Sequence, residues 1–177
     1  MKKHLDLSLV IPVWNEEESI EILINEIDQI LGQFIEYEII VIDDGSHDRT
    51  PAVLETLVGK FWRLRVIRHL QNSGKSIAIR NGVKAARAKW VLTLDGDGQN
   101  DPADILSLYR KLVNDEKGDP LLVVAGYRKK RLDHWFRSFY SRIANQIRAH
   151  LLSDGTPDTG CGLKLFSREQ FLVLPYF

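Results

Sequence analysis

Trp90-Val-Leu-Thr-Leu-Asp-Gly-Asp-Gly-Gln-Asn-Asp101 joins an apolar run to an acidic, glycine-rich end. The β-branched and aromatic residues of the run predict a buried strand, and the residues that follow predict a turn. Asp95 and Asp97 therefore lie at the carboxyl end of a strand, where both carboxylates can face one side and share a hard divalent cation. Gln99 adds a neutral oxygen on that side. Ligands of open α/β sheets bind beyond such strand ends, so the position favours a binding site.

Two simpler interpretations compete with a metal site in this stretch. Asp and Gly are common in ordinary turns for conformational reasons alone, and an acidic turn stays open as an alternative. An EF-hand calcium loop is excluded. It requires Gly at its sixth position and Glu at its twelfth, where this chain has Asn100 and Leu106.

The chain has the composition of an ordinary globular protein. Of its 177 residues, 44% are hydrophobic and 27% are charged, with 24 Lys and Arg balanced by 24 Asp and Glu. We expect a single domain over residues 1–177, because this length supports one core. The net charge of zero gives no overall attraction to nucleic acid. The apolar and aromatic end, residues 171–177, suggests a domain that is truncated at its C-terminus.

Two features bear on where the protein works. A single cysteine, Cys161, excludes an internal disulfide and favours a reducing compartment. The first residues lack the long apolar segment of a signal peptide, and no stretch approaches the roughly 20 apolar residues of a membrane span. We therefore expect a cytoplasmic protein.

Apolar runs alternate with helical patterns along the chain. Strands are predicted at Leu7–Val13, Tyr37–Ile42, Arg63–Arg68, Val91–Leu94 and Leu121–Gly126. Helices are predicted over residues 16–31, 48–58, 74–88 and 101–113, the first with Asn15 as its N-cap. Strands that alternate with helices form parallel βαβ units. The fold class is therefore α/β, an open and mostly parallel sheet flanked by helices.

The segment from Arg131 to Leu151 has one broad apolar stripe, rich in aromatic residues and flanked by arginines. A core-facing helix with a solvated basic face is one interpretation, and a helix that lies on a membrane surface is another. Between Arg128 and Arg148 the basic residues face a single acid, Asp133. This excess of positive charge predicts a local attraction for anions.

Two further motifs follow predicted strands. The second predicted strand ends in Asp43-Asp44-Gly45-Ser46. One interpretation of this motif is a turn, and another is an acidic pocket of the receiver type. Asn72-Ser-Gly-Lys-Ser76 resembles the end of a phosphate-binding P-loop, but the glycine that this motif needs five residues before Gly74 is His69 here. The segment still opens a helix. Its N–H groups can hold an anion there, or Asn and Ser merely cap the helix.

Four segments, in this order and each after a predicted strand, resemble the nucleotide-sugar glycosyltransferases of family 2 with the GT-A fold: Pro12-Val-Trp-Asn-Glu16, Val41-Ile-Asp-Asp-Gly-Ser46, Asn72-Ser-Gly-Lys75 and Asp95-Gly-Asp-Gly-Gln99. The resemblance covers nearly the whole chain and implies a Rossmann-like GT-A sheet. Three later segments look most like the dolichyl-phosphate mannose synthase group, which includes bacterial enzymes that load sugars onto undecaprenyl phosphate: Gly126-Tyr-Arg128, Ser141-Arg-Ile-Ala-Asn145 and Asp158-Thr-Gly-Cys-Gly-Leu-Lys164.

The resemblance implies a role for each residue that matches a motif. The residues implied to bind the nucleotide sugar are Pro12, Trp14, Glu16, Ile42, Asp44, Asp95, Gly96, Asp97 and Gln99. Those implied to hold Mg²⁺ or Mn²⁺ are Asp95, Asp97 and Gln99, and those implied to hold an acceptor phosphate are Arg128, Ser141 and Arg142. The implied catalytic set is Asp97, Arg128, Arg142 and Asp158.

The implied reaction is metal-dependent, inverting transfer of a sugar from a nucleotide sugar to a polyprenyl phosphate, dolichyl or undecaprenyl. The resemblance implies that the enzyme is located on the cytoplasmic face of a membrane and contacts the membrane surface peripherally. No nucleic-acid partner is expected. A phosphate acceptor is already an anion at neutral pH and needs no general base. Two alternatives stay open. One is a family 2 enzyme that acts on a saccharide hydroxyl, with Asp158 as base; the other is a non-catalytic nucleotide-binding or receiver-type module.

Overall fold

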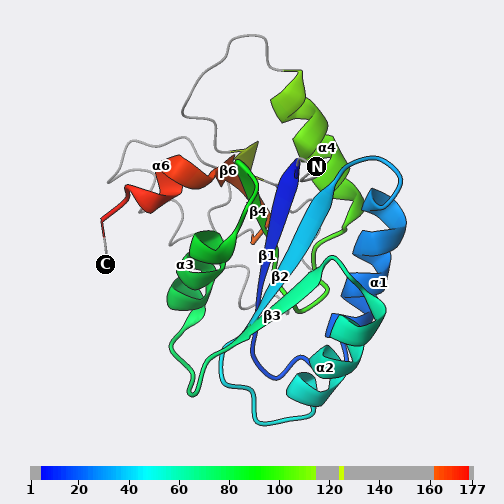
Figure 1. Ribbon diagram of the computed structural model, residues 1–177, viewed down its shortest axis with the longest axis vertical. Helices are drawn as coiled ribbons and strands as arrows, with labels where there is room; N and C mark the ends of the chain where they lie inside the picture. The colour runs from blue at the N-terminus through cyan, green and yellow to red at the C-terminus, as the bar shows by residue number, and fades with distance from the viewer. Residues whose placement is uncertain (1–4, 115–123, 126–161, 176–177) are drawn as a thin grey trace, which may run out of the picture.

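Six strands of the described chain form one open sheet, in the order β3-β2-β1-β4-β6-β5 (Figure 1). The computed structural model describes residues 5–114, 124–125 and 162–175. The strands that run parallel are β1 (Leu7–Val13), β2 (Tyr37–Asp43), β3 (Leu64–Arg68) and β4 (Trp90–Thr93). The strand β6 runs antiparallel to both β4 and β5, with bounds Lys164–Ser167 for β6 and Val124–Ala125 for β5. The predicted α/β fold with a mostly parallel sheet is confirmed.

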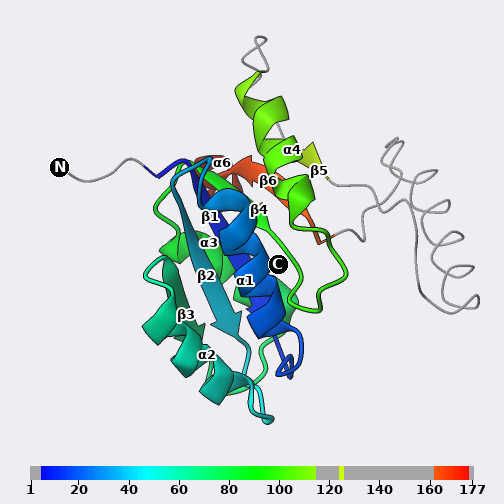
Figure 2. The ribbon, with the colours of Figure 1, turned by 90° about the vertical axis from the view of Figure 1, so that its right-hand side faces the viewer.

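Helices cover both faces of this sheet (Figures 1 and 2). The helices that share a core on one face are α1 (Ile20–Leu31), α2 (Thr50–Lys60) and α4 (Ala103–Val113). Those that share the core on the other face are α3 (Lys75–Ala85) and α6 (Arg168–Leu172). Among the residues that the structure describes, no helix combines the length and the apolar character that crossing a membrane requires.

The strands β1 and β2 are covered on both sides. Leu9 and Ile11 of β1 belong to the core under α1, α2 and α4, whereas Val10 belongs to the core under α3 and α6. Successive side chains of a strand point to opposite faces, so a strand covered on both faces needs a continuous apolar run. Because β1, β2 and β4 are parallel, their carboxyl ends meet at one edge of the sheet.

Gly82 allows α3 to lie directly on the sheet. A Cβ added there would lie 2.6 Å from Ile42 Cδ1 and would overlap Val10 Cγ1. We expect Gly82→Ala to lower the free energy of unfolding by about 1–3 kcal/mol, because core side chains on two strands must move to admit one methyl group. Urea denaturation measures this change.

Gly59 in α2 provides the matched control. An added Cβ at Gly59 meets nothing within 4 Å, so Gly59→Ala should stabilise the protein by up to about 1 kcal/mol through helix propensity. A Gly82→Ala variant as stable as wild type would show that α3 does not pack against the sheet at this point.

The N-cap prediction for Asn15 is wrong. The helix α1 begins only at Ile20, and Asn15 has a positive φ of 57°. Its Oδ1 accepts a hydrogen bond from the His47 N–H at 2.9 Å, and the Glu16 N–H donates to Thr50 Oγ1 at 2.8 Å. This segment therefore binds the loop that precedes α2, and its polar groups are used there instead of at the start of a helix.

Other predicted bounds differ from the structure by a few residues, as helix and strand ends commonly do. The strand predicted at Leu121–Gly126 is described only at Val124–Ala125. The helix expected over residues 131–151, with its two interpretations, lies outside the described residues.

Candidate functional site

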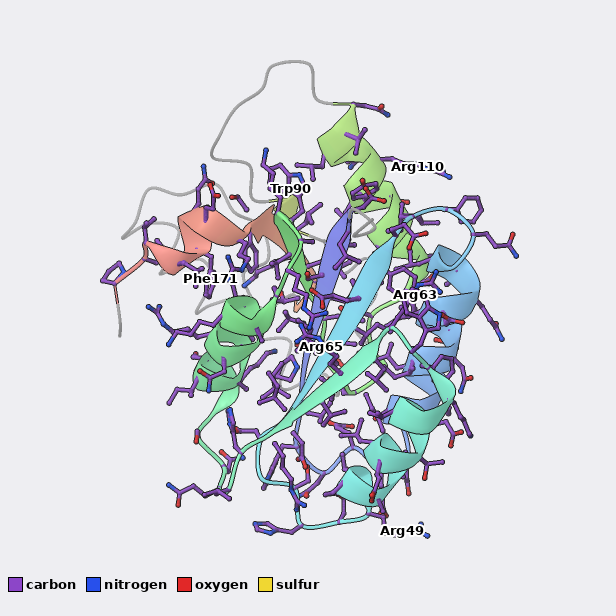
Figure 3. The ribbon with its side chains drawn as sticks, in the orientation of Figure 1. Arg49, Arg63, Arg65, Trp90, Arg110 and Phe171 are labelled. Carbon is purple, nitrogen blue, oxygen red and sulfur yellow. The ribbon has the colours of Figure 1, made fainter. Side chains whose placement is uncertain are left out.

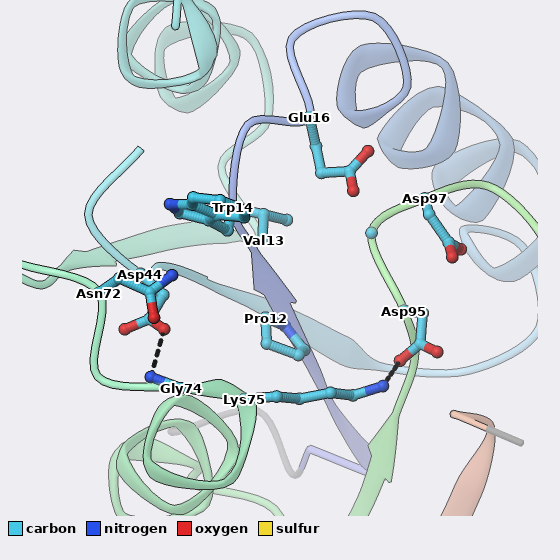
Figure 4. Close-up of a pocket in the computed structure, with 11 residues that line it drawn as sticks. Pro12, Val13, Trp14, Glu16, Asp44, Asn72, Gly74, Lys75, Asp95 and Asp97 are labelled. Atoms are coloured by element: carbon cyan, nitrogen blue, oxygen red, sulfur yellow. Dashed lines mark hydrogen bonds and ion pairs between the residues drawn. The ribbon is translucent and has the colours of Figure 1, made fainter. Parts of the chain in front are cut away.

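The carboxyl ends of β1, β2 and β4 border a cavity of about 310 Å³ (Figure 4). Small-molecule sites commonly have volumes of roughly 300–1,000 Å³. Four segments that are far apart in the sequence line it: Pro12, Val13, Trp14 and Glu16; Asp44; Asn72, Gly74 and Lys75; and Asp95, Gly96 and Asp97. The parallel sheet brings them together because each segment follows a strand.

Asp95 and Asp97 lie in the loop after β4, and both line the cavity (Figure 4). Asp97 is exposed, and its Oδ1 accepts a hydrogen bond from the Gln99 N–H at 3.1 Å. Asp95 is more enclosed, and its Oδ1 lies 2.5 Å from Lys75 Nζ. This ion pair crosses the cavity from the start of α3 to the end of β4, so an ammonium group already occupies one side of the carboxylate pair.

Two glycines shape the chain around these carboxylates. A Cβ at Gly96 would lie 2.5 Å from a side chain of β1, and the Gly96 carbonyl accepts a hydrogen bond from Ser19 Oγ at 2.8 Å. A Cβ at Gly162 would overlap the Asp95 carboxylate. Thr93 Oγ1 donates to the Gly162 carbonyl at 2.8 Å. The turn is thus held by Ser19, which precedes α1, on one side and by the segment that enters β6 on the other.

Asp44 is a buried carboxylate on the opposite wall of the cavity (Figure 4). Its Oδ1 accepts hydrogen bonds from the Ser73 N–H at 2.9 Å and from His69 at 2.6 Å, and its Oδ2 accepts one from the Gly74 N–H at 2.8 Å. Burial alone raises the pKa of Asp44, but these hydrogen bonds outweigh it and lower the pKa below the ordinary 3.8. Asp44 is therefore ionised at neutral pH.

His69 connects Asp44 to α3. Its Nδ1 faces Asp44, and its Nε2 lies 3.0 Å from Asn81 Nδ2. His69 therefore links Asp44 to Asn81 of α3 and fixes the orientation of the carboxylate.

We expect Asp44→Asn to lower the free energy of unfolding by about 1–3 kcal/mol at neutral pH. The new NH₂ group cannot accept from the N–H groups that now surround the carboxylate. A depressed folded pKa gives stability that is present above the unfolded value of 3.8 and is lost as pH falls through the folded pKa. The difference in the free energy of unfolding between wild type and Asp44→Asn should therefore become smaller below pH 3.8. Thermal unfolding as a function of pH measures both effects.

Asp104 of α4 is the control for this variant, because it is an exposed aspartate away from the cavity. Asp104→Asn should leave the stability and its pH dependence close to those of wild type. A stability gap for Asp44→Asn that stays constant into acid would contradict the depressed pKa of Asp44.

The structure places seven of the residues predicted to bind a nucleotide sugar around the cavity: Pro12, Trp14, Glu16, Asp44, Asp95, Gly96 and Asp97. Ile42 does not line it, because its side chain is fully buried in the core beneath α3 and cannot touch a ligand there. Gln99 is exposed and does not line it either. The predicted residues Arg128, Ser141, Arg142 and Asp158 lie outside the described residues.

Asn72, Gly74 and Lys75 also line the cavity, although no role in nucleotide binding was predicted for them. Their motif indicated only a helix start that can hold an anion. The structure shows what this helix start faces: Gly74 binds Asp44 and Lys75 binds Asp95. The start of α3 thus joins the two acidic walls.

The carboxylates of Asp95 and Asp97 fit a hard cation such as Mg²⁺ or Mn²⁺. Within residues 5–114, 124–125 and 162–175, no three His, Cys, Asp or Glu side chains are grouped to hold a metal ion. Two carboxylates supply only part of a coordination shell, and proteins commonly complete the shell of Mg²⁺ with phosphate oxygens and water. The residues present therefore fit a cation that binds together with a diphosphate.

Comparison with known proteins identifies the family. Residues 8–172 match the family described as Glycosyl transferase family 2. This chain belongs to that family. The family resemblance indicated by the four motifs is therefore confirmed, and the four motifs of this family 2 glycosyltransferase are the segments that line the cavity.

Two curated relatives of this family 2 chain are named for polyprenyl-phosphate substrates. It is 35% identical over 165 residues to dodecaprenyl-phosphate galacturonate synthase of Rhizobium johnstonii. It is 33% identical over 165 residues to undecaprenyl-phosphate 4-deoxy-4-formamido-L-arabinose transferase of Aeromonas hydrophila subsp. hydrophila. Both matches cover 92% of this chain but 48% and 49% of the relatives. The chain spans about half the length of the curated relatives it matches.

The structure is similar to that of glucosyl-3-phosphoglycerate synthase from Mycobacterium tuberculosis in complex with UDP. The TM-score is 0.75 at 23% identity, over 97% of this chain and 60% of the other. The same enzyme has been crystallised with Mn²⁺, UDP and phosphoglyceric acid, and with Mg²⁺ and UDP, at TM-scores of 0.68 and 0.74. This likeness confirms the predicted GT-A fold.

Proposed function

We propose that this family 2 glycosyltransferase moves a sugar from a nucleotide sugar to a polyprenyl phosphate, with Mg²⁺ or Mn²⁺ and with inversion at the anomeric carbon. The observation that carries the proposal is the cavity in which the carboxylates of Asp95 and Asp97, the ammonium of Lys75 and the carboxylate of Asp44 converge. The names of the two curated relatives support a polyprenyl-phosphate acceptor.

The charged walls of the cavity suit the diphosphate of a nucleotide sugar. Lys75 and the first N–H groups of α3 attract phosphate oxygens. A divalent cation held by Asp95 and Asp97 supplies the neutralisation that makes the diphosphate a good leaving group. A phosphate oxygen competes with Asp95 for the ammonium of Lys75, so donor binding transfers Lys75 from the carboxylate to the diphosphate.

The opposite wall suits the nucleoside. Trp14 is 51% exposed and lines the cavity, so its ring offers a face on which a base stacks. Asp44 is ionised and accepts hydrogen bonds from N–H groups of the base or from ribose hydroxyls. Pro12 and Glu16 also line the cavity.

The acceptor phosphate needs no general base. Its second pKa is near ~6, so at neutral pH an anionic oxygen attacks the anomeric carbon as the bond to the nucleoside diphosphate breaks. Arg128 and Arg142, with Ser141, are proposed to hold this phosphate, because planar guanidinium groups bind phosphate in a bidentate manner. Asp158 is required as a base only if the acceptor is a saccharide hydroxyl.

A polyprenyl phosphate resides in a membrane, so an enzyme that uses it as acceptor must contact that membrane. We propose that residues 1–177 form a catalytic GT-A domain that associates peripherally with the cytoplasmic face of the membrane that holds the lipid.

Radiolabelled nucleotide sugars and short polyprenyl phosphates test the reaction. We expect Mn²⁺ or Mg²⁺ to be required for label to pass into the organic phase, and EDTA to stop it. Label that passes into oligosaccharide and never into lipid would favour the saccharide-hydroxyl alternative. Binding of the nucleotide without any transfer to either acceptor would favour the non-catalytic module.

A further inference from the structure

The hydrogen bonds of Asp44 use most of the acceptor positions of its carboxylate. An ionised carboxylate has about four such positions, two on each oxygen. Oδ1 uses both of its positions, because it accepts from the Ser73 N–H at 2.9 Å and from His69 Nδ1 at 2.6 Å. Oδ2 uses one position, for the Gly74 N–H at 2.8 Å. Among the residues that the structure describes, these partners leave a single position, on Oδ2, for a ligand in the cavity.

The main chain around Asp44 is fixed on two sides. The Asp44 N–H donates to the Val13 carbonyl of β1 at 2.9 Å, and the His69 N–H donates to the Asp43 carbonyl of β2 at 2.8 Å. Arg68 ends β3 in register with Asp43, which ends β2, so the loop from β3 to α3 begins beside Asp44 (Figure 3). His69 is therefore the first residue of that loop, and it reaches the carboxylate from the neighbouring strand end.

His69 acts on the carboxylate from outside the donor cavity. Its side chain is 12% exposed and does not line this cavity, but lines a separate hollow of about 260 Å³ together with His47 and Leu70. An ionised carboxylate only accepts hydrogen bonds, so His69 is the donor in its contact with Asp44. A ligand in the donor cavity meets Asp44, and His69 affects that ligand through the orientation of the carboxylate.

Asp44 lies away from the carboxylates that are proposed to hold the cation. Figure 4 shows Asp44 and the ring of Trp14 on one side of the cavity and Asp95 and Asp97 on the other. A diphosphate bound with a cation at Asp95 and Asp97 places its nucleoside toward Trp14 and Asp44. The edge of the base then faces a carboxylate that has one acceptor position to offer.

Uracil and guanine differ in the donors that they present to such a carboxylate. In a nucleotide, the uracil ring has one N–H group, whereas guanine has two adjacent donors, the ring N–H and the amino group beside it. Guanine thus pairs best with both oxygens of a carboxylate. At Asp44 the second oxygen is already occupied by Ser73 and His69, so one guanine donor stays unpaired. An enclosed donor without an acceptor weakens binding.

We propose that His69 is a positioning residue for the base of the donor: it holds Asp44 so that one acceptor position faces the cavity, and this arrangement selects uridine diphosphate sugars over guanosine diphosphate sugars. The inference rests on the proposed function, because it takes the ligand to be a nucleotide sugar. A carboxylate that is already oriented by the protein does not have to be ordered when the ligand binds, which favours affinity.

Calorimetry with UDP and with GDP, each in the presence of Mn²⁺, tests the base preference of the wild-type protein. We expect UDP to bind about 10- to 100-fold more tightly than GDP, because GDP leaves one donor unpaired. The inference is overturned if GDP binds as tightly as UDP, or if neither nucleotide binds. A preference for UDP without any sugar transfer would support the inference and contradict the proposed function, so the two failures can be distinguished.

His69→Leu and His69→Asn form a matched pair of similar size. Both remove the imidazole contact with Asn81, but asparagine retains an N–H donor close to the position of Nδ1. We expect His69→Leu to bind UDP about tenfold more weakly and to lose most of the preference for UDP over GDP, whereas His69→Asn keeps the preference. In sugar transfer, His69→Leu should raise KM and leave kcat near that of wild type, because the base is bound equally in the ground state and the transition state.

His47→Leu is the control, because His47 is an exposed histidine that is not a hydrogen-bond partner of Asp44. This variant should bind UDP and GDP as wild type does. General loss of structure would weaken both nucleotides alike, so a change in their ratio reports on the orientation of Asp44. The inference is overturned if His69→Leu keeps the wild-type preference or if His69→Asn loses it.

Discussion

Sugar transfer by Asp97→Asn is expected to be about a thousand-fold slower than that of wild type, or slower still. The amide keeps the shape of the side chain but removes a charged ligand of the divalent cation, whose stabilisation of the leaving group amounts to several kcal/mol. Each 1.36 kcal/mol corresponds to about a tenfold change in rate. Asp97 is exposed, so the free energy of unfolding should change by less than about 0.5 kcal/mol. Initial rates at saturating Mn²⁺ and urea denaturation measure the two quantities.

Asp101→Asn is the control in the same loop. Asp101 is exposed, does not line the cavity, and accepts a hydrogen bond from the Ala103 N–H at 2.9 Å through an oxygen that asparagine retains. Asp101→Asn also removes one negative charge, but the rate of sugar transfer should stay within a few-fold of that of wild type. Unimpaired Mn²⁺-dependent binding of nucleoside diphosphate by Asp97→Asn would show that this carboxylate is not a metal ligand.

Lys75→Met is expected to change the affinities for two ligands in opposite directions. Without the ammonium 2.5 Å from Asp95 Oδ1, Mn²⁺ alone should bind about two- to fivefold more tightly, because a competing cation is removed. The complex of Mn²⁺ with a nucleoside diphosphate should bind about 10- to 100-fold more weakly, because a charge-assisted hydrogen bond to phosphate contributes about 1.5–3 kcal/mol. Electron paramagnetic resonance measures free Mn²⁺, and calorimetry measures nucleotide binding.

Lys111→Met, in an exposed position of α4, is the control and should change neither affinity. Weaker binding of both ligands to Lys75→Met would mean that Lys75 only holds Asp95 in position. Unchanged nucleotide binding would exclude contact between Lys75 and the diphosphate.

The acidic segments that line the cavity could be predicted because each one follows a strand, and a buried strand is recognisable in the sequence as a short apolar run. The apolar run that ends in Asp95 and Asp97 is β4, and the run that ends in Asp43 and Asp44 is β2. Parallel strands place such ends at one edge of a sheet. The position of the cavity follows from this alone, whereas β6, α6 and the order of the strands in the sheet were not predicted.

The contacts within the cavity could not be predicted from local patterns. Lys75 and Asp95 belong to different βα units, and the motif at the start of α3 was equally compatible with simple capping. Asn15 has the side chain of an N-cap but binds His47 of another loop. Ile42 adjoins the acidic pair in sequence, yet strand alternation directs it into the core under α3.

By itself, the sequence determined the α/β class, the parallel sheet and the strand ends that carry acidic residues, because apolar periodicity and turn residues act over a few neighbouring positions. Only the tertiary structure decided which charges meet. The ion pair of Lys75 with Asp95 and the hydrogen bonds that keep Asp44 ionised both depend on the packing of helices on a sheet. Contacts between segments distant in the chain arise from that packing, and no local pattern encodes them.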